Sequence, residues 1–220
     1  MKKTIAIIGA SGKMGSGLTR SLARAGHRIL IAGRTRKRLE SLVAAIKSEL
    51  PNADLEILDC SHEASWEADI VIPAVSFKEQ AAIAARIKDV VTGKIVISIA
   101  NPLNEAYDGL MTSGATSAAE ELAQLLPHSK IVKAFNTVFA ADFDSPEVGG
   151  KTVDNFVAGD DPEAVAIVMK LVREAGFRPL NAGTLEVSRT LESMMLLLIG
   201  LTMKNGYNWH AGWKVLHANA

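Results

Sequence analysis

Short runs of hydrophobic residues alternate along this chain with segments in which apolar residues recur at helical spacing. Residues 5–8 are all apolar, and residues 14–25 place Met14, Leu18 and Leu22 on one helical face. A short continuous apolar run is typical of a strand buried on both faces of a parallel sheet. The same patterns predict further strands at 28–32, 54–58, 69–75, 94–99, 130–135, 156–159 and 177–180, and helices at 39–50, 77–90, 117–126, 162–175 and 185–203.

This alternation of strands and helices predicts an α/β fold, in which helices cover both faces of a doubly wound, mostly parallel sheet. With 220 residues, the chain has room for one such domain and a small helical appendage. We therefore expect a main domain over residues 1–182 and a C-terminal helical segment over residues 183–220.

The connection from the first strand to the first helix contains three evenly spaced glycines. Gly9 permits a tight turn, Gly12 allows the backbone to approach a pyrophosphate, and Gly15 lets the helix pack closely on the strand. The unpaired N–H groups at the start of this helix, together with the Ser11 hydroxyl, suit a phosphate group. The context predicts a Rossmann-type, dinucleotide-binding domain, and the alternative is a tight strand–helix turn without a ligand.

A cluster of cations follows the second predicted strand, in the sequence Gly33-Arg34-Thr35-Arg36-Lys37-Arg38. In a dinucleotide-binding unit this position faces the adenosine ribose, where an acidic residue would bond the 2′-hydroxyl and favour NAD. Arg34 and the cations behind it instead favour the 2′-phosphate of NADP(H). The alternative is a solvated basic helix start, although cations at a helix N-terminus interact unfavourably with the helix dipole.

The predicted helix at 185–203 is apolar almost all round in its second half, as is typical of a buried helix. Too little chain follows to cover it, so we expect a homodimer in which the partner subunit does so. The alternative is packing against the sheet of its own chain. The tail 206–217 is rich in aromatic residues and is expected to face a ligand or a subunit. His210 and His217 have no carboxylate placed with them, so we expect no metal site.

The charge composition is balanced, with 24 basic residues (Lys and Arg) and 24 acidic residues (Asp and Glu). This balance gives no support for nucleic acid or an anionic membrane as a general partner. The single cysteine, Cys60, excludes an internal disulfide bond. The apolar run after Lys3 is shorter than the roughly 7–15 residues of a signal peptide, and residues 194–203 cover about half of a membrane span. We therefore expect a cytoplasmic protein with no membrane partner.

Familiar catalytic patterns are absent from the sequence, which contains no Gly-x-Ser-x-Gly elbow and no Tyr-xxx-Lys pair. Lys204 and Asn208 have the spacing of the catalytic pair of hydroxyacid dehydrogenases but lie too far along the chain to match it. Hydride transfer between two planar cofactors needs no acid–base residue, because the site must only hold the rings face to face and exclude water. We therefore assign no catalytic side chain and favour cofactor-to-cofactor transfer, although a non-catalytic NADP-binding module would look the same.

Several stretches spread over nearly the full length together resemble one family. They are Ile-Ile-Gly-Ala-Ser-Gly-Lys-Met-Gly at 7–15, Ala-Gly-Arg at 32–34, Val-Lys-Ala-Phe-Asn-Thr at 132–137, and Phe-Arg-Pro-Leu-Asn-Ala-Gly at 177–183 with the following Ser188-Arg189 and Leu191-Glu192-Ser193. These stretches are similar to the NADP oxidoreductases that use a deazaflavin coenzyme of the F-420 type. They also resemble the cytosolic domains of six-transmembrane metalloreductases.

The resemblance implies binding roles for residues at the matching positions. The pyrophosphate would be held by Gly9, Ser11, Gly12, Lys13, Met14 and Gly15. The 2′-phosphate would be held by Gly33, Arg34, Thr35, Lys37 and Arg38. The path to the nicotinamide would be lined by Val75, Ser76, Ala100 and Asn101, and the nicotinamide and the second ring would lie beside Asn136, Thr137, Val138 and Ala140.

Two departures from the family pattern concern the second ring. The family tends to have a proline soon after the threonine of Lys-Ala-Phe-Asn-Thr, where this chain has Phe139, and a shorter, less aromatic tail. The second ring therefore stays open between a deazaflavin, FMN or FAD, and another acceptor. The segment 183–220 is expected to supply the second-ring site and the dimer contact.

The expected function is that of an NADPH-dependent oxidoreductase, which transfers a hydride between NADP(H) and a deazaflavin or a flavin. Two alternatives remain at this point. One is an NADP-dependent dehydrogenase or reductase of a small carbonyl or imine substrate, and the other is a non-catalytic NADP-binding regulator.

Overall fold

The structure is a computed structural model that describes residues 2–218. Its α-helices are α1 (Lys13–Arg24), α2 (Arg36–Glu49), α3 (Ser61–Glu67), α4 (Phe77–Ile87), α5 (Ala118–Leu125), α6 (Pro162–Glu174) and α7 (Ser188–Asn205). Its strands are β1 (Thr4–Ile8), β2 (Arg28–Ala32), β3 (Leu55–Ile57), β4 (Ile70–Pro73), β5 (Ile95–Ser98), β6 (Lys130–Lys133), β7 (Glu147–Val148), β8 (Lys151–Thr152), β9 (Asp154–Gly159) and β10 (Arg178–Gly183). Two short 3₁₀ helices, η1 (Ala140–Phe143) and η2 (Leu185–Val187), complete the elements.

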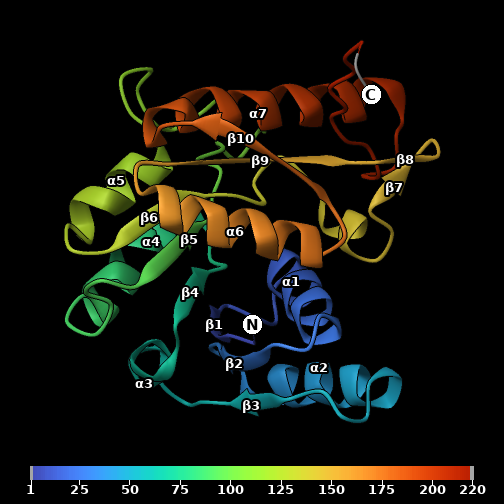
Figure 1. The fold of residues 1–220 in the computed structure, drawn as a ribbon. Helices are drawn as coiled ribbons and strands as arrows, with labels where there is room; N and C mark the ends of the chain where they lie inside the picture. Colours follow the sequence, from blue (N-terminus) through green and yellow to red (C-terminus); the bar gives the residue numbers. More distant parts are fainter. Residues whose placement is uncertain (1, 219–220) are drawn as a thin grey trace.

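Eight of the strands form one sheet in the order β10-β9-β6-β5-β4-β1-β2-β3 (Figure 1). The first six strands, β1 to β6, are mutually parallel. Their order, 3-2-1-4-5-6, is that of a dinucleotide-binding sheet. The chain builds outward from β1 to β3 and then returns to β4 on the other side of β1. The carboxyl ends of β1 and β4 therefore flank the switch point, where open α/β sheets bind their ligands.

The last two strands of the sheet run in the opposite direction. β9 pairs antiparallel with β6, where Val132 lies opposite Gly159, and β10 pairs parallel with β9. The small hairpin of β7 and β8 precedes them. The sheet is thus mostly parallel, and the expected Rossmann-type, doubly wound fold class is confirmed.

Helices cover both faces of the sheet, and each face has its own apolar core. On one face Leu18 and Leu22 of α1 and Val168 of α6 pack in a cluster that also contains residues of α2. On the other face Ala64 of α3, Ile87 of α4 and the residues of α5 form the second cluster. The strands between them are almost fully buried, which explains why their sequences are continuously apolar.

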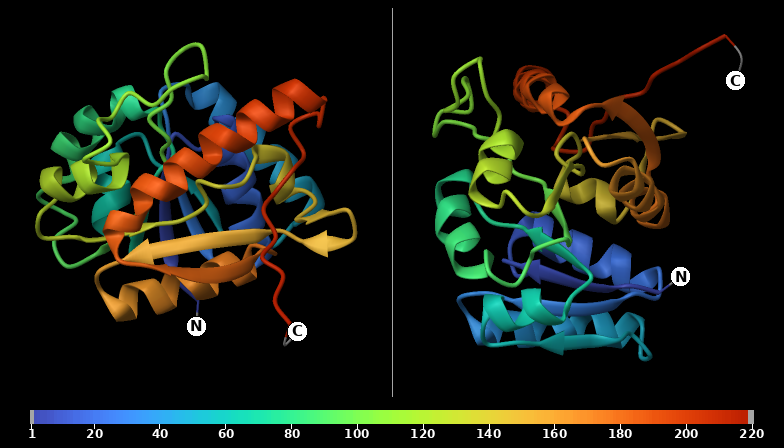
Figure 2. Two further views of the ribbon diagram at one scale, coloured as in Figure 1. Left: turned by 90° about the horizontal axis from the view of Figure 1, so that it is seen from above. Right: turned by 60° about the vertical axis from the view of Figure 1, so that its left-hand side comes forward.

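α7 and the tail after it form a third, smaller cluster. Met195, Leu198 and Ile199 of α7 pack with Phe139 and Ala211. Figure 1 shows α7 above β9 and β10, at the opposite end of the molecule from α2 and β3, and Figure 2 shows its axis crossing the sheet obliquely. The predicted boundary between residues 182 and 183 falls at the end of β10, and the division into two units stays a prediction.

Several local expectations differ from the structure. Residues 61–67 form α3, and residues 147–152 form the hairpin of β7 and β8; neither had been predicted. The predicted helix at 185–203 begins with the turn η2 and continues as α7 to Asn205. α7 is also not buried on all sides. One face is buried within its own chain, while Leu197 and Leu201 are exposed.

Candidate functional site

The turn after β1 lies directly at the switch point and is tied to both neighbouring strands. The N–H of Gly9 donates to the Ala32 carbonyl at the end of β2, at 2.7 Å, and the N–H of Ala74 after β4 donates to the Ile8 carbonyl, at 2.7 Å. Gly9 has a φ of +85°, and a Cβ there would lie 2.5 Å from the Ala74 carbonyl oxygen. Only glycine combines this conformation with this close approach.

The start of α1 packs equally closely against the same turn. A Cβ on Gly15 would lie 2.4 Å from the Gly9 carbonyl oxygen and 2.8 Å from the Ala10 Cα. The α1 N-terminus is therefore fixed at the switch point. Within the described residues, no side chain caps this helix and no acidic side chain lies in its first turn. Its first N–H groups are available to an anion, and the helix dipole favours one there.

The end of β2 adjoins this turn and carries the cationic cluster. Gly33 lies against the turn, since a Cβ there would be 3.7 Å from Ser11 Oγ. Thr35 occupies the N-cap position of α2, and the exposed side chains of Lys37 and Arg38 lie in the first turn of that helix. Arg34 is 90% exposed, so its guanidinium is accessible to a ligand.

The acidic partner of Arg34 comes from the other side of the switch point. Arg34 Nη1 lies 2.9 Å from Glu79 Oε1, in the first turn of α4. Glu79 Oε2 also accepts a hydrogen bond from the Ser76 hydroxyl, at 2.9 Å. Arg36, by contrast, is paired with Glu40 and Asp59. Arg34, Ser76 and Glu79 therefore form a polar link between the ends of β2 and β4, beside Val75.

Two asparagines join the carboxyl ends of β5 and β6. Asn101 Nδ2 donates to the Asn136 carbonyl at 2.9 Å, and Asn136 Nδ2 donates to Asn101 Oδ1 at 3.0 Å and to the Leu191 carbonyl of α7 at 3.1 Å. Just before Asn136, Phe135 has a φ of +58°, and its N–H donates to Asn155 Oδ1 at 3.0 Å. A bulky residue in this conformation is strained, and such strain is typical of functional loops.

Buried polar atoms at this end of the sheet still lack partners. Asn136 Oδ1 and Thr137 Oγ1 have no hydrogen-bond partner among the described residues, and both side chains are almost fully buried. A buried polar group without a partner is costly and calls for an explanation such as a ligand or an ordered water. A polar ring substituent such as a carboxamide, which both donates and accepts, fits the chemistry of these two atoms.

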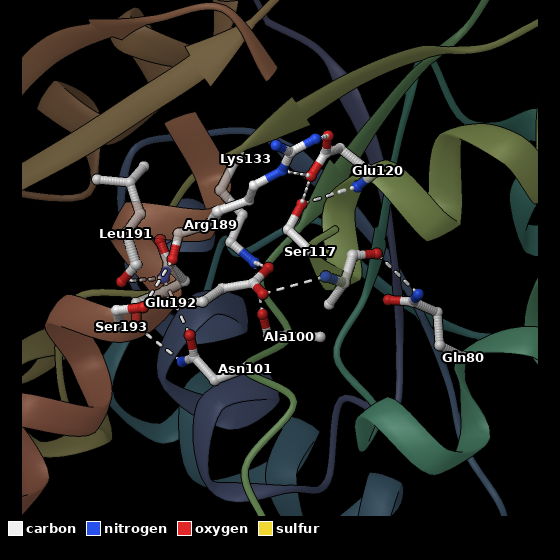
Figure 3. A network of polar contacts seen from close by, with 12 residues as sticks. Gln80, Ala100, Asn101, Ser117, Glu120, Lys133, Arg189, Leu191, Glu192 and Ser193 are labelled. Atoms are coloured by element: carbon white, nitrogen blue, oxygen red, sulfur yellow. Dashed lines mark hydrogen bonds and ion pairs between the residues drawn. The ribbon is translucent and has the colours of Figure 1, made fainter. Parts of the chain in front are cut away.

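An ion pair lies beneath the two asparagines (Figure 3). Lys133 Nζ donates to Glu192 Oε1 and to the Ala100 carbonyl, each at 2.5 Å, and Glu192 Oε2 accepts from the Ala118 N–H at 3.1 Å. The side chains of Lys133 and Glu192 are 0% and 1% exposed. Burial lowers the pKa of the Lys133 ammonium from its ordinary value, and the Glu192 carboxylate opposes that shift.

The comparisons with known proteins agree with this geometry. A family model described as "NADP oxidoreductase coenzyme F420-dependent" matches residues 4–102. An F420-dependent NADP reductase of Methanocaldococcus jannaschii is 33% identical over 211 residues, which cover 91% of this chain and 92% of that protein. This chain belongs to the F420-dependent NADP oxidoreductase family.

Other similarities lie within or near this family. The crystal structure of a proposed F420-dependent NADP-reductase from Arthrobacter sp. FB24 superposes with a TM-score of 0.83 at 25% identity, over 98% of this chain and 100% of that one. The metalloreductase STEAP3 of Rattus norvegicus is 28% identical over 89% of this chain and 37% of that protein. An imine reductase from Myxococcus stipitatus, with a TM-score of 0.67 at 15% identity, covers 94% of this chain and 64% of that one and shares the fold alone.

In this family member, the segment after Thr137 connects the sheet to the C-terminal tail. Val138 is buried and Ala140 begins η1. Asp142 of η1 accepts a hydrogen bond from the Phe139 N–H at 2.7 Å and lies 3.0 Å from His210 Nδ1. Burial raises the pKa of the Asp142 carboxyl to about 6, against the opposing effects of the Phe139 N–H and His210. The rings of Phe139 and Trp209 pack edge to face, with centroids 5.5 Å apart.

The structure therefore brings the predicted residues together in two groups along one edge of the sheet. The first group, at the ends of β1, β2 and β4, contains Gly9, Ser11, Gly12, Lys13, Met14, Gly15, Gly33, Arg34, Thr35, Lys37, Arg38, Val75 and Ser76. The second group, at the ends of β5 and β6, contains Ala100, Asn101, Asn136, Thr137, Val138 and Ala140.

Sequence reasoning missed the acidic and buried partners of these residues. Glu79, Lys133, Glu192 and the pair of Asp142 with His210 all contact predicted site residues or their immediate neighbours. The available signal was a charge within an apolar segment. Lys133 interrupts an apolar strand, and a buried charge needs a buried partner; Glu192 lies among polar residues at the start of α7 and carries no such signal.

Between residues 2 and 218 no group of three or more His, Cys, Asp and Glu side chains could hold a metal ion. None of the helices in that range has the length and hydropathy required of a membrane span.

Proposed function

We propose that this chain transfers a hydride between NADP(H) and a deazaflavin coenzyme of the F420 type. The observation that carries the proposal is the uncapped N-terminus of α1, held in a glycine cradle at the switch point beside the exposed cation Arg34. Relatives that match over nine-tenths of the chain, and that are F420-dependent NADP reductases by description, supply the second coenzyme.

In this proposal residues 1–182 bind NADP(H). The N–H groups of the first turn of α1, with Ser11 Oγ, would hold the pyrophosphate. Arg34 would bind the 2′-phosphate, with Lys37 or Arg38 as further cations on α2. Arg34 is already oriented by Glu79, at 2.9 Å, so it lies at the correct edge of the sheet before any nucleotide binds.

The nicotinamide would lie at the ends of β5 and β6. Asn101 and Asn136 are held by their mutual hydrogen bonds, and the unpartnered Asn136 Oδ1 and Thr137 Oγ1 suit the carboxamide group. The segment 183–220 would complete the second-ring site, because the tail residue Trp209 packs on Phe139 next to Val138 and Ala140.

The hydride chemistry itself is supplied by the two ring systems when they are bound. The chain's own residues orient the rings and exclude water from the space between them. The hydrogen-bonded asparagines fix the nicotinamide side, and the apolar surface of Phe139 and Trp209 shields the other. This division explains why no acid–base side chain is required.

The test is an absorbance assay at the NADPH band. The protein is mixed with NADPH and, in parallel cuvettes, with F420, FMN, FAD or no acceptor. We expect rapid oxidation of NADPH with F420 and at least a hundredfold slower oxidation with either flavin. Turnover with FMN or FAD but not with F420 would mean that the second coenzyme is a flavin and not a deazaflavin. Tight NADPH binding without oxidation by any acceptor would contradict it and indicate a binding module.

We also propose that the functional form is a homodimer that uses the outer face of α7. Leu197 is 54% exposed and Leu201, one turn later, is 37% exposed. These two leucines share a face that the chain itself does not cover, and exposed apolar patches of this kind commonly mark interaction sites. A second copy of the same helix would cover them symmetrically.

A further inference from the structure

The first two turns of α7 contact the sheet through polar groups as well as apolar ones. Leu191 offers its carbonyl to Asn136 Nδ2, and the next residue, Glu192, binds the Lys133 ammonium at 2.5 Å. Lys133 in turn donates to the Ala100 carbonyl, which directly precedes Asn101. Figure 3 shows these groups converging from α7, β6 and the end of β5. One turn of α7 therefore holds both strand ends that carry the second group of site residues.

The burial of this pair makes a purely stabilising role a poor explanation. Both side chains are essentially inaccessible, and removing two charges from water costs free energy that their attraction offsets only in part. Buried ion pairs of this kind are often replaced by apolar residues of similar volume without loss of stability. The attraction between the two charges is therefore not by itself a reason for the chain to keep them.

The geometry supplies a different reason for keeping the pair. Apolar residues could fill the same volume, but they could not donate to the Ala100 carbonyl or accept from the Ala118 N–H. Without these bonds the strand end at Ala100 would lose its fixed position relative to α7. Asn101 and Asn136, which depend on that strand end and on the Leu191 carbonyl, would lose theirs as well.

We infer that Lys133 and Glu192 are positioning residues that hold the nicotinamide side of the site, through the Ala100 carbonyl, in register with α7. This inference rests on the proposed function, since it assigns the nicotinamide to the ends of β5 and β6. The pair touches neither coenzyme. It determines the distance between the strand ends, which face one ring, and the C-terminal segment, which faces the other.

The test compares single variants with a double variant. Lys133→Met and Glu192→Met each leave one buried charge unpaired, and we expect both to lower the melting temperature. The double variant Lys133→Met/Glu192→Met removes both charges, so its melting temperature should be higher than that of either single variant; it should stay below the wild type because the Ala100 carbonyl and the Ala118 N–H lose their partners. Glu192→Gln, which keeps the side-chain shape, serves as a second variant should the double variant not fold.

Two ligands are used to measure binding at the two ends of the nucleotide site separately. 2′-Phospho-ADP-ribose contains every part of NADP except the nicotinamide, so its Kd reports the site at β1, β2 and β4 alone. We expect the double variant to bind it within twofold of the wild type. NADPH should bind at least fivefold tighter than this fragment in the wild type, and that advantage should fall below twofold in the double variant. Hydride transfer to F420 in a single turnover should slow at least tenfold.

A matched control uses a second ion pair of α7, which joins this helix to α5. Arg189 binds Glu120 at 2.6 Å but is 34% exposed at its side chain and makes no bond to Ala100 or the asparagines. Arg189→Met with Glu120→Gln should change the melting temperature while the NADPH advantage and the transfer rate stay within twofold. If this control lost as much of the NADPH advantage and of the transfer rate as the double variant does, a specific positioning role for Lys133 and Glu192 would be contradicted.

The remaining outcomes are distinct from one another. A stable double variant that keeps both the NADPH advantage and the transfer rate would show that the pair is only structural. Equal binding of NADPH and 2′-phospho-ADP-ribose by the wild type would also overturn the inference. A wild type that prefers NADPH to the fragment but reduces no F420 would contradict the proposed function. In that case the binding comparison would still decide the role of the pair.

Discussion

Arg34 is the residue that should distinguish NADPH from NADH. Its side chain is 90% exposed, is paired with Glu79 and lies beside the glycine turn that follows β1. If Arg34 binds the 2′-phosphate as proposed, Arg34→Gln removes that contact, and we expect at least a tenfold loss of NADPH affinity, which corresponds to about 1.4 kcal/mol. NADH lacks that phosphate, so its affinity should change less than threefold. Fluorescence titration of each nucleotide measures both constants.

The control for this prediction is a second arginine two residues later, at the start of α2. Arg36→Gln removes the same charge, but Arg36 is bound to Glu40 and Asp59 instead. The long-range electrostatic effect is therefore matched, and NADPH affinity should fall less than threefold. Equal losses for NADPH and NADH in Arg34→Gln would mean that Arg34 does not bind the 2′-phosphate.

Asp142 should make the stability of the protein depend on pH in an unusual direction. Burial raises the pKa of its carboxyl from 3.8 to about 6, so between these values the folded state binds more protons than the unfolded state. The free energy of unfolding that this group contributes is fully present below pH 3.8 and is lost as the pH rises through 6. The loss is on the order of 2 to 3 kcal/mol.

Asp142→Asn removes this titration and keeps an oxygen to accept from the Phe139 N–H. We expect the melting temperature of the variant, relative to the wild type, to rise steadily from pH 4 to pH 7. Calorimetry at half-unit pH steps measures the difference, and the wild type in the same buffers cancels the effects of other groups. A difference that does not change with pH would show that Asp142 titrates normally.

The sequence predicted those site residues whose chemistry is visible locally. The glycines of the phosphate turn and the cations after β2 are close neighbours along the chain, and their spacing alone indicates a phosphate site. Lys133 and Glu192 are 59 residues apart, and nothing in either local pattern identifies the other as its partner. Glu79 was missed because its contact with Arg34 depends on β4 lying on the far side of β1.

At the scale of the element, burial decides which segments could be predicted. The central strands are buried on both faces, so their continuous apolar runs identify them directly. Helix α3 was missed because its seven residues bury only Ala64 and Ser65, which leaves almost no apolar stripe. The packing of α7 was only half predictable, because a nearly uniform apolar sequence does not show which of its faces its own chain will cover.

The C-terminal tail is an element whose removal should affect one coenzyme only. Truncation after Asn205 removes Trp209 from Phe139 and His210 from Asp142. If the segment completes the second-ring site, the KM for F420 should rise at least fivefold. The Kd of NADPH should stay within twofold, because the nucleotide turn at β1 and the cations after β2 are unchanged.

Steady-state kinetics and nucleotide titration measure the two effects separately. Truncation after Leu216 is the control, because it keeps Trp209 and His210 as well as the hydrogen bond from the Val215 N–H to Asp154. Circular dichroism confirms that both shortened chains are folded. An unchanged KM for F420 in a folded chain that ends at Asn205 would remove the tail from the second-ring site.

At the scale of the whole molecule, the strand order explains how distant segments form one site. Because the strand order reverses at β1, the ends of β2 and β4 lie on either side of the end of β1. The ends of β5 and β6 follow along the same edge. Strands β9 and β10 then extend the sheet in the opposite direction to β6, and Figure 1 shows α7 beyond them. A nucleotide that follows this edge would run from the cations of α2 toward the ion pair beneath α7.

The molecule also leaves one apolar helix face uncovered, and that face leads to the last prediction. Leu197→Asp places a carboxylate in the middle of the exposed face of α7, next to Leu201, without disturbing the buried face. If two copies pair through this face, the charge is buried in the interface and should convert the dimer to a monomer. Light scattering after size-exclusion chromatography measures the molar mass directly.

A matched control separates this effect from a general effect of surface charge. Trp66 is 66% exposed and lies on α3, and Figure 1 shows α3 at the opposite end of the molecule from α7. Trp66→Asp introduces the same charge at another exposed apolar position, and its mass should remain that of the wild type. A wild type that is monomeric at high concentration, or a Leu197→Asp variant that stays dimeric, would mean that α7 does not form the interface. Such a dimer would matter for the site as well, because the first turns of α7 carry the buried ion pair and a partner on its outer face would restrict its movement.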